Sequence, residues 1–192
     1  MRPQLDIPQM WTYDELVAYV ESLPHDVDPR NYEIVDGALV VTPSPDVDHE
    51  IVSEGIRAAI RVALEPGYMV IGPIDVDLNP SYRAPDLVVV PTALFGTGTR
   101  LVRPVDAQLV VEVVSPSSVT TDRITKPAQY AAAGIPAYWR VETSPEVSLT
   151  AYTLPAGASV YSKSGTWSRG QIARLDEPFA IEIAIDELSP GR

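Results

Sequence analysis

Residues Gln108 to Pro116 read QLVVEVVSP, and this stretch decides the fold. Its β-branched apolar residues are typical of a strand that is covered on both faces of a sheet. Glu112 lies in the middle of the run. A lone buried carboxylate costs several kcal/mol unless it is paired, protonated or bound to a metal. The stretch therefore predicts a buried strand and a buried acidic site at the same place.

A second acid stands at the start of an upstream apolar run. Residues 84–90 read APDLVVV, so that Asp86 opens this second strand. Asp86 and Glu112 are 26 residues apart (112 − 86), a separation compatible with neighbouring strands joined by a long hairpin. If the two strands pair, both carboxylates converge on one point. Two converging carboxylates suit a hard cation such as Mg²⁺.

Composition narrows the class of protein. The 192 residues are enough for one domain with a substantial core, and the absence of cysteine excludes disulfides and thiolate metal sites. No signal peptide and no apolar run of membrane-spanning length are evident, so we expect a cytoplasmic protein with no membrane partner. The net charge of −12 weighs against a protein that coats nucleic acid non-specifically, but it does not exclude a nuclease.

The remaining sequence predicts a hairpin and two main helices around these strands. Asp36-Gly37 between apolar runs indicates a hairpin of residues 32–35 and 38–42. Apolar residues at spacings of three and four predict a helix over about 48–64. Residues 68–71 and 74–78 indicate strand with a bend at Gly72-Pro73, and residues 137–141 indicate another strand. A shorter helix is expected over about 126–133, with Pro127 at its first position, and Pro127 argues against an unbroken helix from Asp122.

We therefore expect an α+β fold (α/β-like) in which helices flank a mixed β-sheet. The core order is helix, three strands, helix and strand (αβββαβ), over about residues 48–142. The hairpin precedes this core, and β segments over about 147–185 follow it. A helix that begins with a capping box, Thr12 with Glu15, comes before the hairpin. Residues 1–192 are expected to form a single domain.

Five segments in this order resemble a large bacterial family of restriction-endonuclease-like proteins, long catalogued as a domain of unknown function, within the PD-(D/E)xK nuclease superfamily. They are YEIVDG (32–37), Ser44-Pro45 followed by His49, APDLVVV (84–90), VEVVSPS (111–117), and KPAQY (126–130) leading into AGIPAYW (133–139). The resemblance spans about residues 12–155. It implies a restriction-endonuclease-like fold and metal-dependent cleavage of nucleic acid.

The resemblance also implies roles for individual residues. Asp86 and Glu112 would hold Mg²⁺ or Mn²⁺, with the backbone carbonyl of Val113 as a third ligand. The superfamily lysine is expected two residues after Glu112, where this chain has Val114. Lys126, on the following helix, is the candidate that replaces it.

Two upstream residues are possible accessories to this site. Glu33 and His49 could each complete the metal shell or orient water.

Structural alternatives stand beside these roles. Glu112 could form a buried ion pair with Arg140 or Arg123, Lys126 could be an exposed residue near a helix start, and His49 could be a surface or capping residue. Further residues have simple structural readings: Tyr130, Tyr138 and Trp139 as core residues, and Asp75 and Asp77 as a solvated strand face.

The function expected from these residues is a Mg²⁺- or Mn²⁺-dependent nuclease acting on nucleic acid, with DNA as the first choice. A homodimer is compatible with this function, because duplex cleavage commonly uses two sites. The arginines nearest in sequence that could meet phosphates are Arg83, Arg100, Arg103 and Arg123. Two alternatives remain: a non-catalytic nuclease-like binding module, and a metal-dependent hydrolase of a small phosphodiester.

Overall fold

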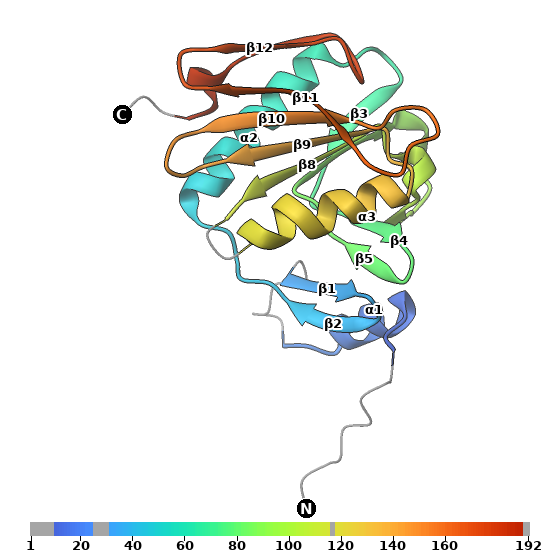
Figure 1. Ribbon diagram of the computed structural model, residues 1–192. Coiled ribbons are helices and arrows are strands. Elements are labelled where there is room, and N and C mark those ends of the chain that lie inside the picture. Colours follow the sequence, from blue (N-terminus) through green and yellow to red (C-terminus); the bar gives the residue numbers. More distant parts are fainter. Residues whose placement is uncertain (1–9, 25–30, 116–117, 190–192) are drawn as a thin grey trace, which may run out of the picture.

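The computed structural model describes residues 10–24, 31–115 and 118–189, so Pro116 and Ser117 of the resemblance lie outside the described residues. Figure 1 shows a sheet with a helix on each side, and a smaller region that contains the hairpin. The described residues form three α-helices: α1 (Tyr13–Glu21), α2 (Val47–Ala63) and α3 (Lys126–Ala132). Within these residues no helix is both long enough and apolar enough to cross a bilayer.

The strands form two mixed sheets and a two-stranded one. The larger sheet has six strands in the order β11 (Ser162–Ser168), β10 (Ser148–Thr153), β9 (Ala137–Glu142), β8 (Leu109–Val114), β6 (Leu87–Pro91), β3 (Tyr68–Ile71). The second has five, in the order β2 (Ala38–Val41), β1 (Tyr32–Val35), β5 (Ser81–Arg83), β4 (Asp75–Leu78), β7 (Leu101–Val102). Strands β12 (Ile172–Leu175) and β13 (Ile181–Ala184) pair with each other.

The α+β class and the order of elements around β8 agree with the sequence, but the expectation of one mixed sheet is wrong. Along the chain, the strands of the six-stranded sheet and the helices beside them come in the order α2, β3, β6, β8, α3, β9. The stretch 68–78 divides between the two sheets, because the chain turns at Gly72-Pro73. β3 then pairs with β6, whereas β4 pairs with β5 and β7.

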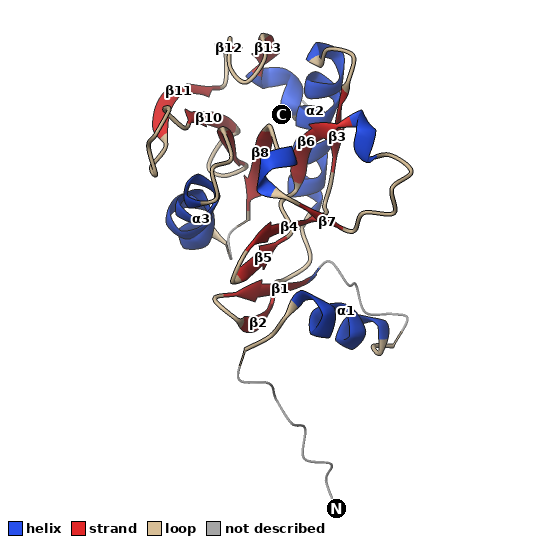
Figure 2. Cartoon of the chain, turned by 90° about the vertical axis from the view of Figure 1, so that its right-hand side faces the viewer, coloured by secondary structure: helices blue, strands red, loops and turns tan. Residues whose placement is uncertain are grey.

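Strand β8 is buried along its whole length, as its apolar run predicts. Alternate side chains of a strand point to opposite faces of the sheet. Leu109, Val111 and Val113 pack in the core beneath α2, whereas Val110 packs with Tyr130 and Tyr138 on the α3 side. Figure 2 shows α2 and α3 on opposite sides of this sheet. Glu112 shares the face of Val110, so its carboxylate points toward α3.

The pairing of β8 with β6 determines where Asp86 lies relative to Glu112. β6 runs antiparallel to β8, with Leu87 opposite Val111 and Val88 opposite Val110. Continuing this register by one residue sets Asp86 opposite Glu112. β9 runs parallel to β8, and a parallel pair requires a crossover connection, which here contains α3.

The predicted hairpin and the first helix cap are confirmed. β1 and β2 pair in full register around Asp36 and Gly37, both of which have positive φ. Thr12 and Glu15 form the reciprocal bonds of a capping box at α1.

The start of α3 differs from the expectation that Pro127 would break the helix. The chain is already helical before Lys126, and residues Thr121–Thr125 form a π-helical turn. In that turn the Lys126 N–H donates to the carbonyl of Thr121, five residues back. The wider turn admits a proline that an α-helical interior would not accept.

The interpretation of Asp75 as part of a solvated strand face is also wrong. Asp75 is half-buried, and its carboxylate accepts a hydrogen bond of 3.0 Å from the Tyr13 hydroxyl of α1. Burial is the largest cause that raises the pKa of Asp75, to about 6 from an ordinary value of 3.8; the Tyr13 bond opposes it.

The raised pKa predicts a pH-dependent stability. The folded protein holds a proton on Asp75 more tightly than the unfolded chain, so this group favours folding below about pH 4. That contribution is lost as pH rises through about 6. We expect Asp75→Asn to become more stable relative to wild type as pH rises from 4 to 7, in urea unfolding. A difference that does not change with pH would contradict this account.

Candidate active site

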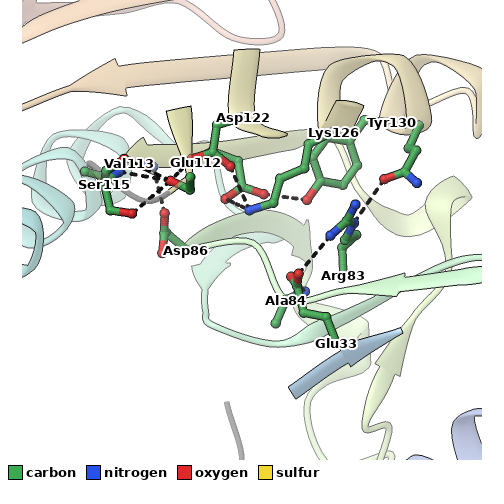
Figure 3. Close-up of polar contacts among 12 residues, drawn as sticks. Glu33, Arg83, Ala84, Asp86, Glu112, Val113, Ser115, Asp122, Lys126 and Tyr130 are labelled. Atoms are coloured by element: carbon green, nitrogen blue, oxygen red, sulfur yellow. Dashed lines mark hydrogen bonds and ion pairs between the residues drawn. The ribbon is translucent and has the colours of Figure 1, made fainter. Parts of the chain in front are cut away.

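Two carboxylates from neighbouring strands meet in one pocket. Asp86 directly precedes β6, and Glu112 lies in the middle of β8 (Figure 3). The pocket has a volume of about 580 Å³ and is also lined by Glu33, His49 and Lys126. Every site residue predicted from the sequence, including Val113, therefore lines the same pocket.

Glu112 is 2% exposed and has two donors from α3. The Lys126 ammonium lies 2.7 Å from its Oε2, and the Tyr130 hydroxyl donates to its Oε1 at 2.6 Å. The proposed pairing of Glu112 with Arg140 or Arg123 is wrong, because both arginines contact Glu142 instead, each at 3.0 Å.

Lys126 is buried, not exposed, although it stands at the first residue of α3. Its ammonium lies between Glu112 and a second carboxylate, Asp122, whose Oδ1 is 3.0 Å away. Val114 occupies the position, two residues after Glu112, at which the resemblance led us to expect a lysine. The helix thus brings to Glu112 a lysine that the strand does not supply.

The charges in the pocket are unequal. The pocket is lined by the acids Glu33, Glu50, Asp86, Glu112 and Asp122 and by the cations Arg57, Arg83 and Lys126. Burial raises the pKa of Glu112 to about 8, and the Lys126 charge only partly offsets this effect. Burial lowers the pKa of Lys126, but Glu112 and the other nearby acids outweigh it and raise that pKa. Lys126 is therefore charged at neutral pH.

Asp86 is held at both oxygens. Its Oδ2 accepts a 2.7 Å hydrogen bond from the Val113 N–H, and its Oδ1 lies 3.2 Å from Nε2 of His49. Burial lowers the pKa of His49, but Asp86, with Glu50 and Asp46, reverses this and raises it. His49 lies in the first turn of α2, whose N-cap Asp46 accepts from the His49 N–H. The structure thus brings His49 to the site.

Glu33 supports the site through other residues. Its two oxygens accept hydrogen bonds of 2.9 Å from Arg83 and 3.0 Å from the Ala84 N–H. Arg83 is buried and also contacts Gln129 of α3. Glu33 therefore ties the hairpin to the segment that carries Asp86, and it does not touch Asp86 in any contact among the described residues.

The four arginines considered as phosphate contacts are engaged elsewhere. Arg83 is buried against Glu33, which makes it a structural residue. Arg100, Arg103 and Arg123 pair with Glu21, Asp106 and Glu142 at 2.8 to 3.0 Å. A phosphate contact from any of these three would have to exchange with an existing ion pair.

The donors of the pocket fit a hard divalent cation. Carboxylate oxygens are the ligands Mg²⁺ prefers, and Mg²⁺ is commonly bound by one or two carboxylates together with waters and substrate phosphates. Among residues 10–24, 31–115 and 118–189, no three His, Cys, Asp or Glu side chains form a ready metal-binding group. The carboxyl groups of Asp86 and Glu112 therefore suit a site that substrate oxygens and water complete.

Asp122 and Tyr130 belong to the site but were not predicted. Asp122, Lys126 and Tyr130 are spaced four residues apart, which places them on one face of a helix. That spacing was a usable signal. It was obscured because Pro127 argued against a helix extending back to Asp122, and because a buried tyrosine is most simply a core residue.

The comparisons with known proteins agree on one family. The model of the Uma2 family, described as "Putative restriction endonuclease", matches residues 17–186. A crystal structure described as "a putative nuclease belonging to DUF820 from Anabaena variabilis ATCC 29413" is similar, with a TM-score of 0.67 and 15% identity. The similarity covers 90% of this chain and 96% of that chain, and at this identity it concerns the fold alone. No curated protein matches the chain.

Gly72 lies close to the backbone of Asp86, and replacing it tests how tightly these two segments pack beside the pocket. A Cβ on Gly72 would lie 2.2 Å from the Asp86 carbonyl oxygen, whereas a Cβ on Gly67 would meet nothing within 4 Å. Both residues have positive φ. We expect Gly72→Ala to lower the free energy of unfolding by about 1–3 kcal/mol more than Gly67→Ala, because only Gly72→Ala adds an overpacking cost. Equal losses in urea unfolding would contradict this packing.

Proposed function

Because the chain belongs to the Uma2 family, we propose that it is a metal-dependent nuclease of the PD-(D/E)xK superfamily, acting on nucleic acid, with DNA as the proposed substrate. The observation that carries the proposal is the meeting of Asp86, Glu112 and Lys126 in one pocket. Two acids from paired strands can hold a divalent cation, and a lysine from the next helix can stabilise phosphate charge, which together support metal-dependent phosphodiester hydrolysis. The restriction-endonuclease-like assignment of the fold belongs to the same proposal.

Asp86 and Glu112, with the carbonyl of Val113, would hold Mg²⁺ or Mn²⁺. A bound divalent cation polarises the scissile phosphate and lowers the pKa of a coordinated water. The protein supplies the acids at fixed positions: β6 and β8 set them opposite each other, and the Val113 N–H and His49 hold the Asp86 carboxylate.

Lys126 is assigned to the phosphate. An ammonium has three protons, and the described contacts of Lys126 with side chains go to Glu112 and Asp122. A proton of the ammonium that these contacts do not use can be donated to a phosphoryl oxygen, where a positioned cation stabilises the charge that develops during hydrolysis. Overall, a P–O bond to water forms and the P–O bond to the leaving nucleotide breaks.

The two accessory residues take different roles in this proposal. His49 orients Asp86 through its Nε2 and lines the pocket, so it can also hold a water there. Glu33 acts at a distance, because both of its oxygens are bound to Arg83 and Ala84. We assign His49 to the site itself and Glu33 to positioning the Asp86 segment. A homodimer would supply two such sites to a duplex.

A hydrolase of a small phosphodiester is a second candidate, favoured by the pocket. Its volume of about 580 Å³ lies within the range of small-molecule sites. The net charge of −12 and the paired arginines also offer little attraction to a long polyanion. Supercoiled plasmid and bis(p-nitrophenyl) phosphate as parallel substrates separate the two candidates.

The nuclease proposal predicts which variants lose activity. With Mg²⁺ or Mn²⁺, wild type should nick supercoiled plasmid, and Asp86→Asn or Lys126→Gln should reduce the rate by about 10²-fold or more, as loss of one electrostatic stabiliser does elsewhere. Matched controls exist for both changes. Lys163 is the only other lysine of the chain and is exposed on β11, and Asp77 lies on β4, away from the pocket.

Lys163→Gln and Asp77→Asn should retain the wild-type rate. Each variant is first checked for folding by thermal unfolding. Nicking that persists in Asp86→Asn, or a wild type that cleaves only the small phosphodiester, would overturn the assignment as a nuclease.

A further inference from the structure

Asp122 is the most deeply buried acid of the pocket and has no role in the reaction as described so far. It is 1% exposed, and its Oδ1 lies 3.0 Å from the Lys126 ammonium. Its Oδ2 accepts a short hydrogen bond from the Ser118 hydroxyl. Lys126 is therefore bound by two carboxylates that come from different elements, Glu112 from β8 and Asp122 from the helical segment of Lys126 itself.

The π-helical turn fixes the backbone of Asp122. Its hydrogen bonds run five residues back, as the bond from the Lys126 N–H to the Thr121 carbonyl shows. In the same pattern the carbonyl of Asp122 would accept from residue 127, which is a proline without an N–H. The Tyr138 hydroxyl of β9 donates to this carbonyl at 2.7 Å instead. Asp122 is thus held by its main chain and by its side chain.

Glu112 and Asp122 are not equivalent as partners of Lys126. Glu112 Oε2 binds the ammonium, and Glu112 is also assigned to the divalent cation. A cation at Glu112 competes with the ammonium for the same carboxylate and repels it. Asp122 binds the ammonium through a contact that is separate from Glu112, so this contact can persist when Glu112 changes partner.

We propose that Asp122 is the positioning residue that keeps the Lys126 ammonium at the pocket when Glu112 binds a divalent cation. The inference rests on the proposed function and deepens it. Without Asp122, a cation at Glu112 leaves the lysine with no carboxylate among its described partners. The ammonium then turns away from the site where a phosphate would lie. Asp122 touches neither substrate nor reacting atoms in this scheme and acts through Lys126.

The chain offers a direct probe, because Lys126 and Lys163 are its only lysines. Protein labelled with ¹⁵N and ¹³C in lysine gives two side-chain ammonium signals, one buried and one exposed. Lys163 serves as the internal reference. The probe ligand is Mg²⁺ alone, added to saturation to wild type, Asp122→Asn and the control Asp106→Asn, whose acid pairs with Arg103 outside the pocket.

The expected result depends on the cation. Without Mg²⁺, both wild type and Asp122→Asn should show a Lys126 ammonium protected from exchange with water, because Glu112 binds it. With Mg²⁺, the protected signal should persist in wild type and Asp106→Asn and be lost in Asp122→Asn. The nicking rate of Asp122→Asn should fall about 10–100-fold, as for other residues that orient a site. The nicking rate of Ser118→Ala, which keeps the charge of Asp122, should lie between those of wild type and Asp122→Asn. Ser118→Ala replaces Asp122→Asn as the test variant if Asp122→Asn does not fold.

Four outcomes decide the matter. A Lys126 signal that persists in Asp122→Asn with Mg²⁺ overturns the proposal. A signal lost already without Mg²⁺ also overturns it, because Asp122 would then be a general structural support. If wild type binds Mg²⁺ but does not nick DNA, the proposed function fails while the signals still decide the role of Asp122. If wild type does not bind Mg²⁺ at all, both proposals fall together.

Discussion

The burial of one carboxylate in the central strand is the constraint on which the rest of the structure depends. Glu112 lies among valines in β8, on a sheet covered on both faces. Leaving that group without partners would cost several kcal/mol. Lys126 and Tyr130 supply the donors, so α3 must lie across this face with one particular side turned inward. The position of the helix and the position of the acid therefore determine each other.

The same constraint explains how the chain manages without a lysine on β8. A side chain at position 114 would share the face of Glu112, and here it is a buried valine. Lys126 of α3 contacts the Glu112 carboxylate in place of a lysine on β8. Because Asp122 and Lys126 share a helical face, the helix brings an acid together with its lysine. The pocket thus holds Asp86 and Glu112 from the strands beside Lys126 from the helix, a set of groups that a divalent cation would complete.

Much of the fold and of the candidate site could be predicted from the sequence, because the patterns that indicate them lie within short segments of the chain. The apolar runs around Asp86 and Glu112 predicted neighbouring strands with converging acids, and Asp36-Gly37 predicted the hairpin. The division of residues 68–78 between two sheets could not be predicted, since each half has an ordinary strand pattern. The contacts of Glu33 with Arg83 and Ala84 join residues about fifty positions apart, and only the tertiary arrangement sets such a pairing.

The π-helical turn depends on contacts that the local sequence does not contain. Pro127 correctly indicated that an ordinary α-helix could not pass through it unchanged, but a helix can widen as well as end. The hydroxyl that donates to the carbonyl of Asp122 in this turn belongs to Tyr138 of β9. Such a contact between separate elements cannot be predicted from the local sequence. The boundary predicted at Pro127 separates Asp122 from the helix of Lys126, whereas Tyr130 lies inside the predicted helix and has the simple interpretation of a core residue.

Calorimetric titration of Mg²⁺ tests the central claim, that the buried acid of β8 is a cation site, most directly. Wild type and Glu112→Gln are compared, with Asp77→Asn as a control outside the pocket. The account predicts saturable binding to wild type and to the control, and its loss in Glu112→Gln. Wild type that binds no divalent cation, or Glu112→Gln that binds as wild type does, would contradict it.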